Sequence, residues 1–366
     1  MKIGILTFHH SRNYGAVLQA YGLQEVLLRM GHKVEVINYR NTAIEERKKP
    51  FTLRKFKSNP LRFFTLFLNV YFNYRRKVKN FRSFEGECLN VTKNEYLPND
   101  ILNSDYDCLV IGSDQVWSPV ITNGPDAVFW GAYKPINAKM ITYAASSSAI
   151  STLETEDFKQ VGEWLERFDN ISVREERLKV FVESHSNQKT QVVIDPTLLA
   201  DRSIFERITS DNIIKEPYIL LYSVESMPHL ISIAKKVAKL YNAKIVRAGS
   251  NGLTAMIRDY RNNVTYKNAS VQEMLGLVKH AECVVALSFH GTALSLLYEK
   301  EFFSVRGGNM GRVEALLSRC HLMNKIVDKP DQVKRETINY DEVNKAINEY
   351  RSCSLQWLRN ALVGGI

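Results

Sequence analysis

A histidine at the junction of an apolar strand and a helix is the residue of this sequence best placed for proton transfer. His290 lies in the run Ser288-Phe289-His290-Gly291, between the expected strand Cys283–Leu287 and the expected helix Thr292–Tyr298. The dipole at a helix N-terminus lowers the pKa of an imidazole, and an anion bound there raises it again. His290 is therefore predicted to transfer protons near neutral pH, with Gly291 letting a ligand approach the backbone. The alternative is a hydrogen-bonded core histidine.

Polar residues also follow two apolar strands of the first half. One group opens a helix whose free N–H groups can hold an anion or a sugar oxygen, and it comprises Asn13, Tyr14 and Gly15. The other group follows the strand Cys108–Ile111 and comprises Ser113, Asp114, Gln115 and Trp117. Carboxylate and amide groups bind sugar hydroxyls while an indole covers an apolar sugar face, so this group is a candidate carbohydrate site. In the alternative interpretation Asp114 caps a helix and Trp117 belongs to the core.

A single arginine stands in a similar position after a third strand. Arg174 follows the short apolar run Ile171–Val173 and opens the next helix. Its guanidinium could bind a phosphate or a carboxylate through two parallel hydrogen bonds. Spacing alone leaves an ordinary surface ion pair with Glu175 or Glu176 equally open.

Motifs of several other enzyme classes are missing from the sequence. It contains no G-x-G-x-x-G, no Walker loop, no G-x-S-x-G and no H-E-x-x-H. His9 and His10 are adjacent rather than on one helical face, and the five cysteines form no C-x-x-C pair. We therefore predict no metal site and no bound cofactor.

Apolar runs that alternate with helical stretches predict parallel sheets wound by helices, which would bring the chemical residues together at strand ends. The expected strands are Lys2–Phe8, Lys33–Tyr39, Asp107–Gly112 and Lys139–Ala144, then Tyr218–Val224, Lys244–Ala248, Cys283–Leu287 and Phe302–Val305. The predicted α/β fold has two Rossmann-like domains that face a cleft. They span residues 1–205 and 206–340, and a C-terminal helix in residues 341–366 is expected to pack back across the cleft.

One segment holds the positive charge of the chain. The formal net charge is +10, and residues 47–82 contain twelve Lys or Arg and no Asp or Glu. The aromatic helix expected at Leu61–Tyr74 is too short to span a bilayer but suits an anionic membrane surface. The alternative is an insertion packed on its own domain. No nucleic-acid recognition motif accompanies the charge, and no secretory signal is present, so we expect a cytoplasmic protein, peripheral at the inner face of the membrane, without a nucleic-acid partner.

Six short motifs, taken in order along the chain, resemble those of the polysaccharide pyruvyl transferase family. They are Asn13-Tyr14-Gly15-Ala16, Gly112-Ser113-Asp114-Gln115-Val116-Trp117, Tyr143-Ala144-Ala145-Ser146, Ser172-Val173-Arg174-Glu175, Asp195-Pro196-Thr197 and Ser288-Phe289-His290-Gly291-Thr292-Ala293. The resemblance implies a glycosyltransferase-B-like fold and phosphoenolpyruvate as a co-substrate rather than a cofactor. It also implies a sugar acceptor that becomes a cyclic pyruvate ketal.

The resemblance also implies roles for individual residues. His290 is expected to be the catalytic acid and base, Arg174 the donor-binding arginine, and Asp114 a candidate base for the acceptor hydroxyl. Many family members carry an arginine where this chain has Ser288, so Arg306 or Arg312 is expected to complete the phosphate contact. The remaining donor contacts are expected from Ser288, Phe289 and Gly291, and the acceptor contacts from Asn13, Tyr14, Gly15, Ser113, Gln115 and Trp117.

The expected acceptor is a lipid-linked oligosaccharide of capsular or exopolysaccharide biosynthesis, modified at hydroxyls 4 and 6 of a galactose-type residue. Two other functions stay open. One is a glycosyltransferase or a sugar-nucleotide epimerase of similar fold, and the other is a non-catalytic, membrane-associated assembly factor. The second would leave His290, Arg174 and Asp114 without a role.

Overall fold

The structure is a computed structural model that describes residues 1–47, 60–153, 155–223, 228–248, 262, 264–307 and 310–364. Residues 48–59 of the predicted basic insertion lie outside the described residues, as does Val224 at the end of one predicted strand.

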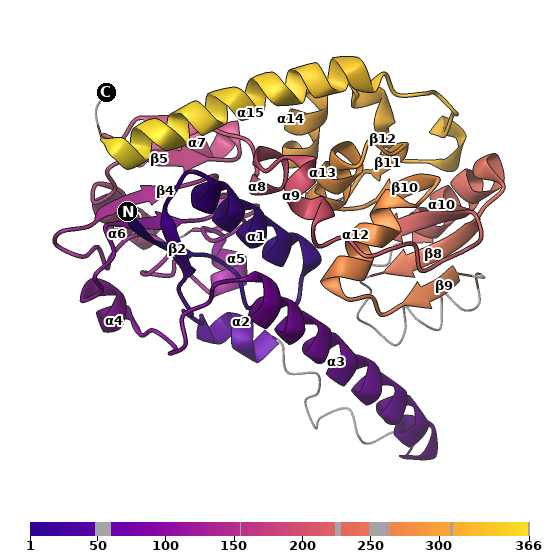
Figure 1. Ribbon diagram of the computed structural model, residues 1–366, viewed down its shortest axis with the longest axis horizontal. Helices are drawn as coiled ribbons and strands as arrows, with labels where there is room; N and C mark the ends of the chain where they lie inside the picture. Colours follow the sequence, from indigo (N-terminus) through magenta and orange to yellow (C-terminus); the bar gives the residue numbers. More distant parts are fainter. Residues whose placement is uncertain are drawn as a thin grey trace.

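The first half of the chain alternates strands and helices (Figure 1). Its elements are β1 (Lys2–Leu6), α1 (Tyr14–Arg29), β2 (Lys33–Val36), α2 (Thr42–Arg47), α3 (Pro60–Cys88), α4 (Pro98–Leu102), β3 (Cys108–Ile111), α5 (Pro119–Thr122), β4 (Lys139–Thr142), the 3-10 helix η2 (Ile150–Thr152), α6 (Thr155–Leu165), β5 (Ile171–Val173), α7 (Glu176–His185), β6 (Thr190–Val192), α8 (Pro196–Leu199) and α9 (Arg202–Glu206).

The second half repeats the alternation and closes with a long helix. Its elements are β7 (Tyr218–Tyr222), α10 (Pro228–Tyr241), β8 (Lys244–Ala248), β9 (Val264–Lys267), α12 (Val271–Lys279), β10 (Cys283–Ala286), α13 (Phe289–Leu297), β11 (Phe302–Val305), α14 (Gly311–Arg319), the 3-10 helix η3 (Met323–Lys325), β12 (Ile326–Val327), the 3-10 helix η4 (Pro330–Gln332) and α15 (Tyr340–Val363).

The strands form parallel sheets in both halves, as predicted. The first sheet has the order β2-β1-β3-β4, and single bridges at Ile141–Asn170 and Ala145–Val173 continue it toward the β5–β6 pair. The second sheet has the order β12-β11-β10-β7-β8-β9. Every pairing between named strands is parallel among the described residues. The predicted α/β fold is therefore confirmed, whereas the boundaries at residues 205 and 340 stay predictions.

The strand order fixes where a ligand can bind in each sheet. In the first sheet β2 and β3 lie on opposite sides of β1, and in the second sheet β8 and β10 lie on opposite sides of β7. The connections that follow β1 therefore run to opposite sides of that strand, and those around β7 do the same. This reversal opens a crevice at the carboxyl ends of the strands. His9 follows β1, Asp114 follows β3, and His290 follows β10. The sequence thus delivers polar residues to both crevices.

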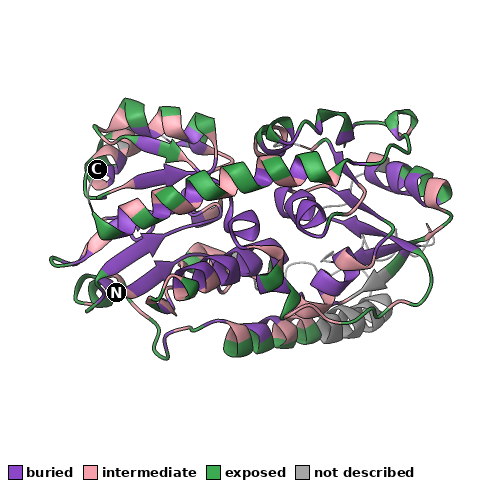
Figure 2. Ribbon diagram, turned by 45° about the horizontal axis from the view of Figure 1, so that its top comes forward, coloured by how far each residue is buried: buried purple, intermediate pink, exposed green. Residues whose placement is uncertain are grey.

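One hydrophobic core cluster spans both halves, while a second lies within the first half and a third within the second half. The shared cluster joins Leu18 and Leu23 of α1 to Leu294 of α13 and Met274 of α12. Helix α8 packs against both α1 and α13. Tyr14 adds a polar tie, because its hydroxyl donates to the carbonyl of Ala269 at 2.7 Å. Figure 2 shows this continuity as buried ribbon that runs from one half to the other.

Helix α15 lies across both halves (Figure 1). Near its start the Tyr340 hydroxyl donates to the carbonyl of Lys300 in the second half. Near its end the carbonyl of Leu362 accepts from the Lys139 ammonium at 3.0 Å, at the start of β4. In its middle the Ser354 hydroxyl accepts from the backbone N–H of Ile194 at 3.0 Å. The helix is therefore bonded to both halves of the chain.

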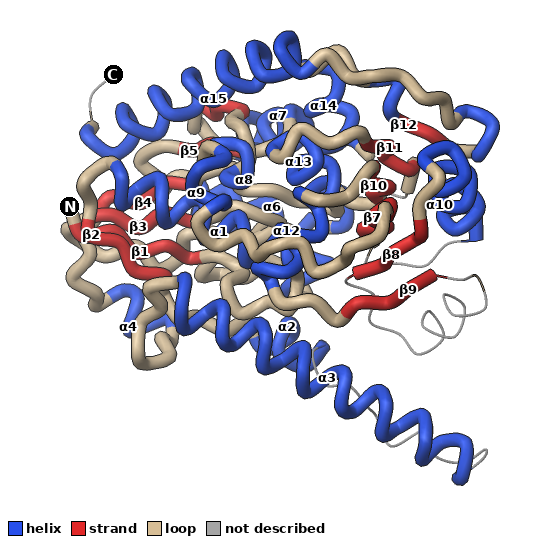
Figure 3. Tube along the Cα trace, turned by 45° about the vertical axis from the view of Figure 1, so that its right-hand side comes forward, coloured by secondary structure: helices blue, strands red, loops and turns tan. Residues whose placement is uncertain are grey.

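Helix α3 is longer than the predicted Leu61–Tyr74, since it runs from Pro60 to Cys88. Its last turns are anchored by Phe81 and Phe84, which pack on Tyr14 and Tyr21 of α1. Its first half extends beyond the rest of the chain (Figures 1 and 3). Among the described residues, no helix combines the length and the apolarity needed to cross a membrane.

Trp117 corrects the interpretation of its ring as a sugar platform. The side chain is fully buried, its indole N–H donates to the carbonyl of Phe129 at 2.7 Å, and its ring stacks on Trp130 at 4.6 Å between centroids. An indole enclosed on both faces by the core cannot cover a sugar. The alternative, in which Trp117 belongs to the core, describes its place in the structure.

Candidate active site

His290 occupies the first turn of α13 rather than the turn before it. The helix begins at Phe289 because the Ser288 hydroxyl caps it, accepting from the Gly291 N–H at 3.2 Å. The His290 residue is only 8 % exposed, and its Nε2 lies 3.8 Å from Oδ2 of Asp195. On its other side lies Gly15 of α1, where a Cβ atom would come within 2.2 Å of the imidazole Cγ and Nδ1. The ring therefore belongs to the second half of the chain but is held by the first.

A buried ion pair lies beside His290. Arg174, at the end of β5, donates through Nη1 to Oδ2 of Asp195, at the start of α8. Its Nη2 donates to the Ser146 hydroxyl at 2.8 Å, and the Phe289 ring covers its guanidinium at 4.7 Å. Asp195 Oδ1 accepts from the backbone N–H and the hydroxyl of Thr197, at 2.9 and 2.6 Å. Both charged groups are thus compensated by close partners, as burial requires.

Burial and neighbouring charges set the protonation of these groups. Burial alone would raise the pKa of Asp195, but Arg174, His290 and the bonds from Thr197 hold that pKa below its ordinary value. Burial lowers the pKa of His290, against the opposing influence of Asp195 and Asp114. His290 is consequently a neutral imidazole at pH 7, and a bound anion would raise its affinity for a proton.

A second arginine reaches the site from the other half. Arg312 of α14 places Nε 3.7 Å from Oε1 of Glu175, which also accepts from the Ser146 hydroxyl. Burial and the nearby charge of Arg174 lower the pKa of Arg312, and burial raises the pKa of Glu175. The carboxylates of Asp114, Asp195 and Glu175 compensate the two guanidinium groups. A bound anion would therefore gain mainly from Arg312, whose Nε has no hydrogen-bond partner among the described residues and whose ion pair with Glu175 is long.

Asp114 completes the charged cluster from the end of β3. Its Oδ1 lies 3.7 Å from Nη2 of Arg174, and its backbone φ of 69° lies in the left-handed region. That backbone is stabilised by a bridge to Ala145 and by the Ser146 N–H, which donates to the Asp114 carbonyl at 2.9 Å. The carboxylate therefore faces the guanidinium that Asp195 holds from the other side.

Buried polar atoms without a hydrogen-bond partner gather at this place. Among the described residues they include Nε of Arg174, Oε2 of Glu175, Nε2 of His290 and Nε of Arg312. Such atoms are rare in folded proteins because each one forfeits its bonds to water. Their concentration in one cluster is the arrangement expected where a polar ligand binds.

The structure brings several predicted site residues into this cluster. His290, Asp114, Arg174 and Arg312 contribute charge or an imidazole, and Phe289 covers Arg174. Two others act as supports. Gly15 leaves room for the His290 ring, and the buried Ser113 hydroxyl donates to the Ala144 carbonyl at 2.8 Å and lies 3.4 Å from Asp195 Oδ2.

Other predicted site residues have structural tasks. Asn13 caps α1 by accepting from the Gly15 N–H at 2.9 Å, and Tyr14 joins the two halves. Arg306 pairs instead with Glu314 at 2.5 Å and Asp328 at 3.1 Å on the surface. Gln115 follows Asp114, and its Oε1 is another buried atom without a partner.

Gly291 corrects a second prediction. A Cβ atom there would meet Tyr222 Cδ1 at 2.9 Å and the Ala286 Cβ at 3.0 Å. The glycine therefore lets α13 pack closely on β7 and β10, and the space beside it is filled by protein rather than left for a ligand.

The sequence assigned no site role to three residues of the cluster, Asp195, Ser146 and Glu175, although all three lie in the motifs of the family resemblance. A signal for Asp195 existed, because an Asp-Pro pair after an apolar strand places a carboxylate at a strand end and at a helix start. Asp195 indeed caps α8 in the structure. Its contact with Arg174 joins residues that lie 21 positions apart, and no local pattern encodes it.

Solved structures with the same arrangement of domains are distant in sequence. A complex of S. aureus MnaA with UDP matches with a TM-score of 0.51 at 10 % identity, covering 97 % of this chain and 90 % of that chain. A putative UDP-N-acetylglucosamine 2-epimerase from Listeria monocytogenes gives 0.52 at 8 %, covering 99 % and 89 %. Another UDP-N-acetylglucosamine 2-epimerase gives 0.53 at 10 %, covering 98 % and 95 %. At these identities the likeness concerns the fold alone.

The fold and the site together define a class of protein. Two Rossmann-like domains of glycosyltransferase-B-like arrangement enclose a histidine, two arginines and several carboxylates drawn from both domains. None of the curated proteins compared with the chain matches it. Residues 13–309 match the family model of polysaccharide pyruvyl transferase, and the chain belongs to that family.

Replacing Asp195 with Asn should destabilise the protein, because it leaves the Arg174 charge buried without its partner. Loss of one member of a buried pair costs about 3–5 kcal/mol. The free energy of unfolding, measured in urea at pH 7, should fall by that amount, while Asp105→Asn at an exposed position should change it little. A loss of less than about 1 kcal/mol for Asp195→Asn would contradict this role.

The same substitution should flatten the acid dependence of stability. The folded-state pKa of Asp195 lies below its unfolded value, so its contribution is present above about pH 4 and is lost as pH falls through the folded pKa. The lowered pKa of His290 also makes the protein less stable as pH falls. Below about pH 6.5 the unfolded chain takes up that proton more readily than the folded chain does.

Proposed function

We propose that the chain transfers the enolpyruvyl group of phosphoenolpyruvate onto two hydroxyls of a sugar and forms a pyruvate ketal. The observation that carries the proposal is the set of unpaired buried atoms on Arg174, Glu175, His290 and Arg312. They lie between the two domains in a member of the polysaccharide pyruvyl transferase family. A small donor with a phosphate and a carboxylate group suits this combination of guanidinium groups and an imidazole.

The proposed reaction begins at the donor. Binding of the anionic donor raises the proton affinity of His290, which then protonates the methylene carbon of the enolpyruvyl group. The adjacent carbon becomes an oxocarbenium-like centre and is attacked by the first sugar hydroxyl, whose proton passes to Asp114. The carbon–oxygen bond to phosphate then breaks, and the second hydroxyl adds to the same carbon and releases its proton. One phosphate leaves for each ketal formed.

Each charged group has a proposed task in this scheme. Arg312 contacts the phosphate or carboxylate of the donor. It supplies the positive charge that many family members supply with an arginine at the position of Ser288. Arg174 acts on the donor through its charge rather than by direct contact, because its side chain is only 3 % exposed and is bonded to Asp195 and Ser146. The field of Arg174 still stabilises negative charge that develops on the departing phosphate.

For the acceptor we propose a lipid-linked oligosaccharide modified at hydroxyls 4 and 6 of a galactose-type residue. The support is the basic helix α3, which extends from the same domain that supplies Asp114. A lipid-linked acceptor would bring the protein to the inner face of the cytoplasmic membrane. An epimerase or glycosyltransferase activity has only the fold in its favour, and a non-catalytic role would leave the unpaired buried atoms without a purpose.

The activity is tested by mixing the full chain with phosphoenolpyruvate and a panel of lipid-linked oligosaccharides that end in galactose, mannose or N-acetylhexosamine. We expect phosphate release that depends on one of these acceptors, with a matching gain in acceptor mass. Phosphate release with none of them would contradict the proposal.

The donor contact is tested by comparing Arg312→Ala with Arg306→Ala. Removing a charge-assisted hydrogen bond worth about 1.5–3 kcal/mol should raise the KM for phosphoenolpyruvate about 10- to 100-fold in Arg312→Ala. Arg306→Ala is the matched control, because Arg306 pairs with Glu314 and Asp328 at the surface, and its KM should stay unchanged. Equal KM values for both variants would remove Arg312 from the donor site.

The placement of His290 is tested by Gly15→Ala. The added methyl group would overlap the imidazole and displace it, so kcat should fall about 100-fold while the chain still folds. Gly86→Ala on α3 is the control, since a Cβ there meets nothing within 4 Å. An unchanged kcat in Gly15→Ala would show that the contact with Gly15 does not position the ring for the reaction.

The membrane contact is tested on the described part of α3. Arg75 and Arg76 are exposed there, and each basic residue near an anionic surface contributes about 1 kcal/mol. Replacing both with Glu should weaken binding to phosphatidylglycerol-containing vesicles about tenfold or more. The double change Lys236→Glu and Lys239→Glu on α10 alters the net charge equally and should have little effect. An equal loss in both variants would point to net charge rather than to α3.

A further inference from the structure

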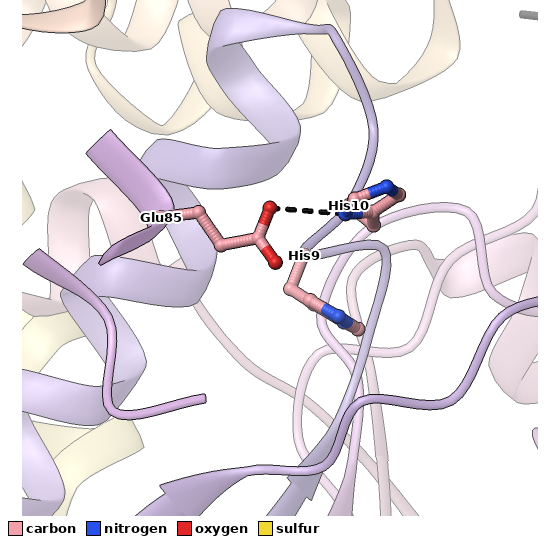
Figure 4. A group of neighbouring side chains, drawn as sticks. All are labelled: His9, His10 and Glu85. Carbon is pink, nitrogen blue, oxygen red and sulfur yellow. Dashed lines mark hydrogen bonds and ion pairs between the residues drawn. The ribbon is translucent and has the colours of Figure 1, made fainter. Parts of the chain in front are cut away.

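Three potential metal ligands meet outside the site described above (Figure 4). His9 and His10 follow β1, and Glu85 comes from α3. One ligand atom from each residue lies within 4.8 Å of the others. The sequence separates Glu85 from His10 by 75 positions, which is why adjacent histidines alone gave no metal prediction.

Two of the ligands lie slightly closer together than two ligands of one metal ion would. The Nδ1 of His10 lies 2.9 Å from Oε2 of Glu85, and Figure 4 shows the ring and the carboxylate facing one another. Bonds of about 2.0–2.2 Å to a tetrahedral metal ion place neighbouring ligand atoms about 3.3–3.6 Å apart. Replacing the direct His10–Glu85 bond by a metal ion therefore needs little movement of either side chain.

The third ligand is buried and has a nitrogen without a partner. His9 is 1 % exposed, and its Nδ1 lies 3.2 Å from the carbonyl of Thr7. A carbonyl only accepts, so Nδ1 carries the hydrogen and Nε2 keeps the lone pair. No group of the described residues lies in hydrogen-bond geometry to Nε2, and the Asn38 side chain is a polar neighbour of the ring. This is the arrangement in which proteins orient a metal-binding histidine through a backbone carbonyl. A metal ion shared with His10 and Glu85 would require the His9 ligand atom, which lies within 4.8 Å of theirs, to move closer to them.

The donor set and its surroundings define the class of ion. Two imidazoles and one carboxylate suit zinc and similar first-row divalent ions, whereas magnesium and calcium prefer oxygen ligands. The hollow beside the cluster is lined by Ser11, Arg12, Phe81 and Arg82 as well as the three ligands. Its two arginines would favour an anion or a water molecule as the fourth ligand.

We propose that His9, His10 and Glu85 form a binding site for one divalent transition-metal ion of the zinc class. The site joins the loop after β1 to helix α3 and is independent of the proposed reaction. Without a metal ion the same residues form a direct ion pair between His10 and Glu85, and this pair is the competing explanation of the cluster.

The test uses the full chain, freed of any histidine tag and stripped with a chelator, and titrates it with Co²⁺ and Zn²⁺. We expect one equivalent bound per chain, with visible cobalt absorption typical of four or five ligands that zinc abolishes. His10→Gln and Glu85→Gln should each weaken the affinity for zinc by about tenfold or more.

Two controls change the same residue types elsewhere. Glu87→Gln lies on the same helix two residues beyond Glu85, and His32→Gln lies beyond the end of α1, and both should bind as the unchanged chain does. Circular dichroism checks that each variant is folded. Binding that is absent, or equally strong in Glu85→Gln and Glu87→Gln, would overturn the proposal and leave the cluster as an ion pair.

Discussion

The buried pair of Arg174 and Asp195 is the interaction on which the rest of the site depends. Two charges removed from water are tolerated only when each one finds close partners, and these partners come from several elements at once. Ser146 and Phe289 accompany the guanidinium, and the first turn of α8 accompanies the carboxylate. The pair therefore fixes the ends of β5 and α8 relative to α13. His290 inherits its position from this arrangement, and its preference for the neutral state follows from its burial there.

The site is a property of both domains together. Gly15 and Asp195 come from the first half, and both lie against His290 of the second half. Arg312 of the second half likewise lies near Glu175 of the first half. The shared hydrophobic core and the Tyr14 hydroxyl bond keep the halves in register. Each unpaired buried polar atom lowers the stability of the fold because it loses its hydrogen bonds to water. The large apolar area buried around these atoms offsets this loss. The same unpaired atoms give the site its capacity to bind a polar ligand.

The sequence predicted the strands of this protein better than the contacts between distant residues. The apolar runs identified β3, β7 and β10, because a strand buried on both faces is built almost entirely from apolar residues. The position of His290 followed from the rule that ligands bind at strand ends. Helix α14 was missed although Val313, Leu316 and Leu317 recur at helical spacing. Sequence spacing could not separate Arg312 from Arg306 or place Asp195 beside Arg174, since these contacts depend on how distant segments pack.

Helix α15 has a consequence for how the two domains can move. Its 24 residues form a rod about 36 Å long, and this rod is bonded to the second domain near its start and to the first domain near its end. A stiff rod attached to both bodies keeps the distance between the two attachment points constant. Simple separation of the domains is therefore opposed. Because Gly15 and His290 come from opposite domains, the rod also helps to keep the His290 imidazole against α1.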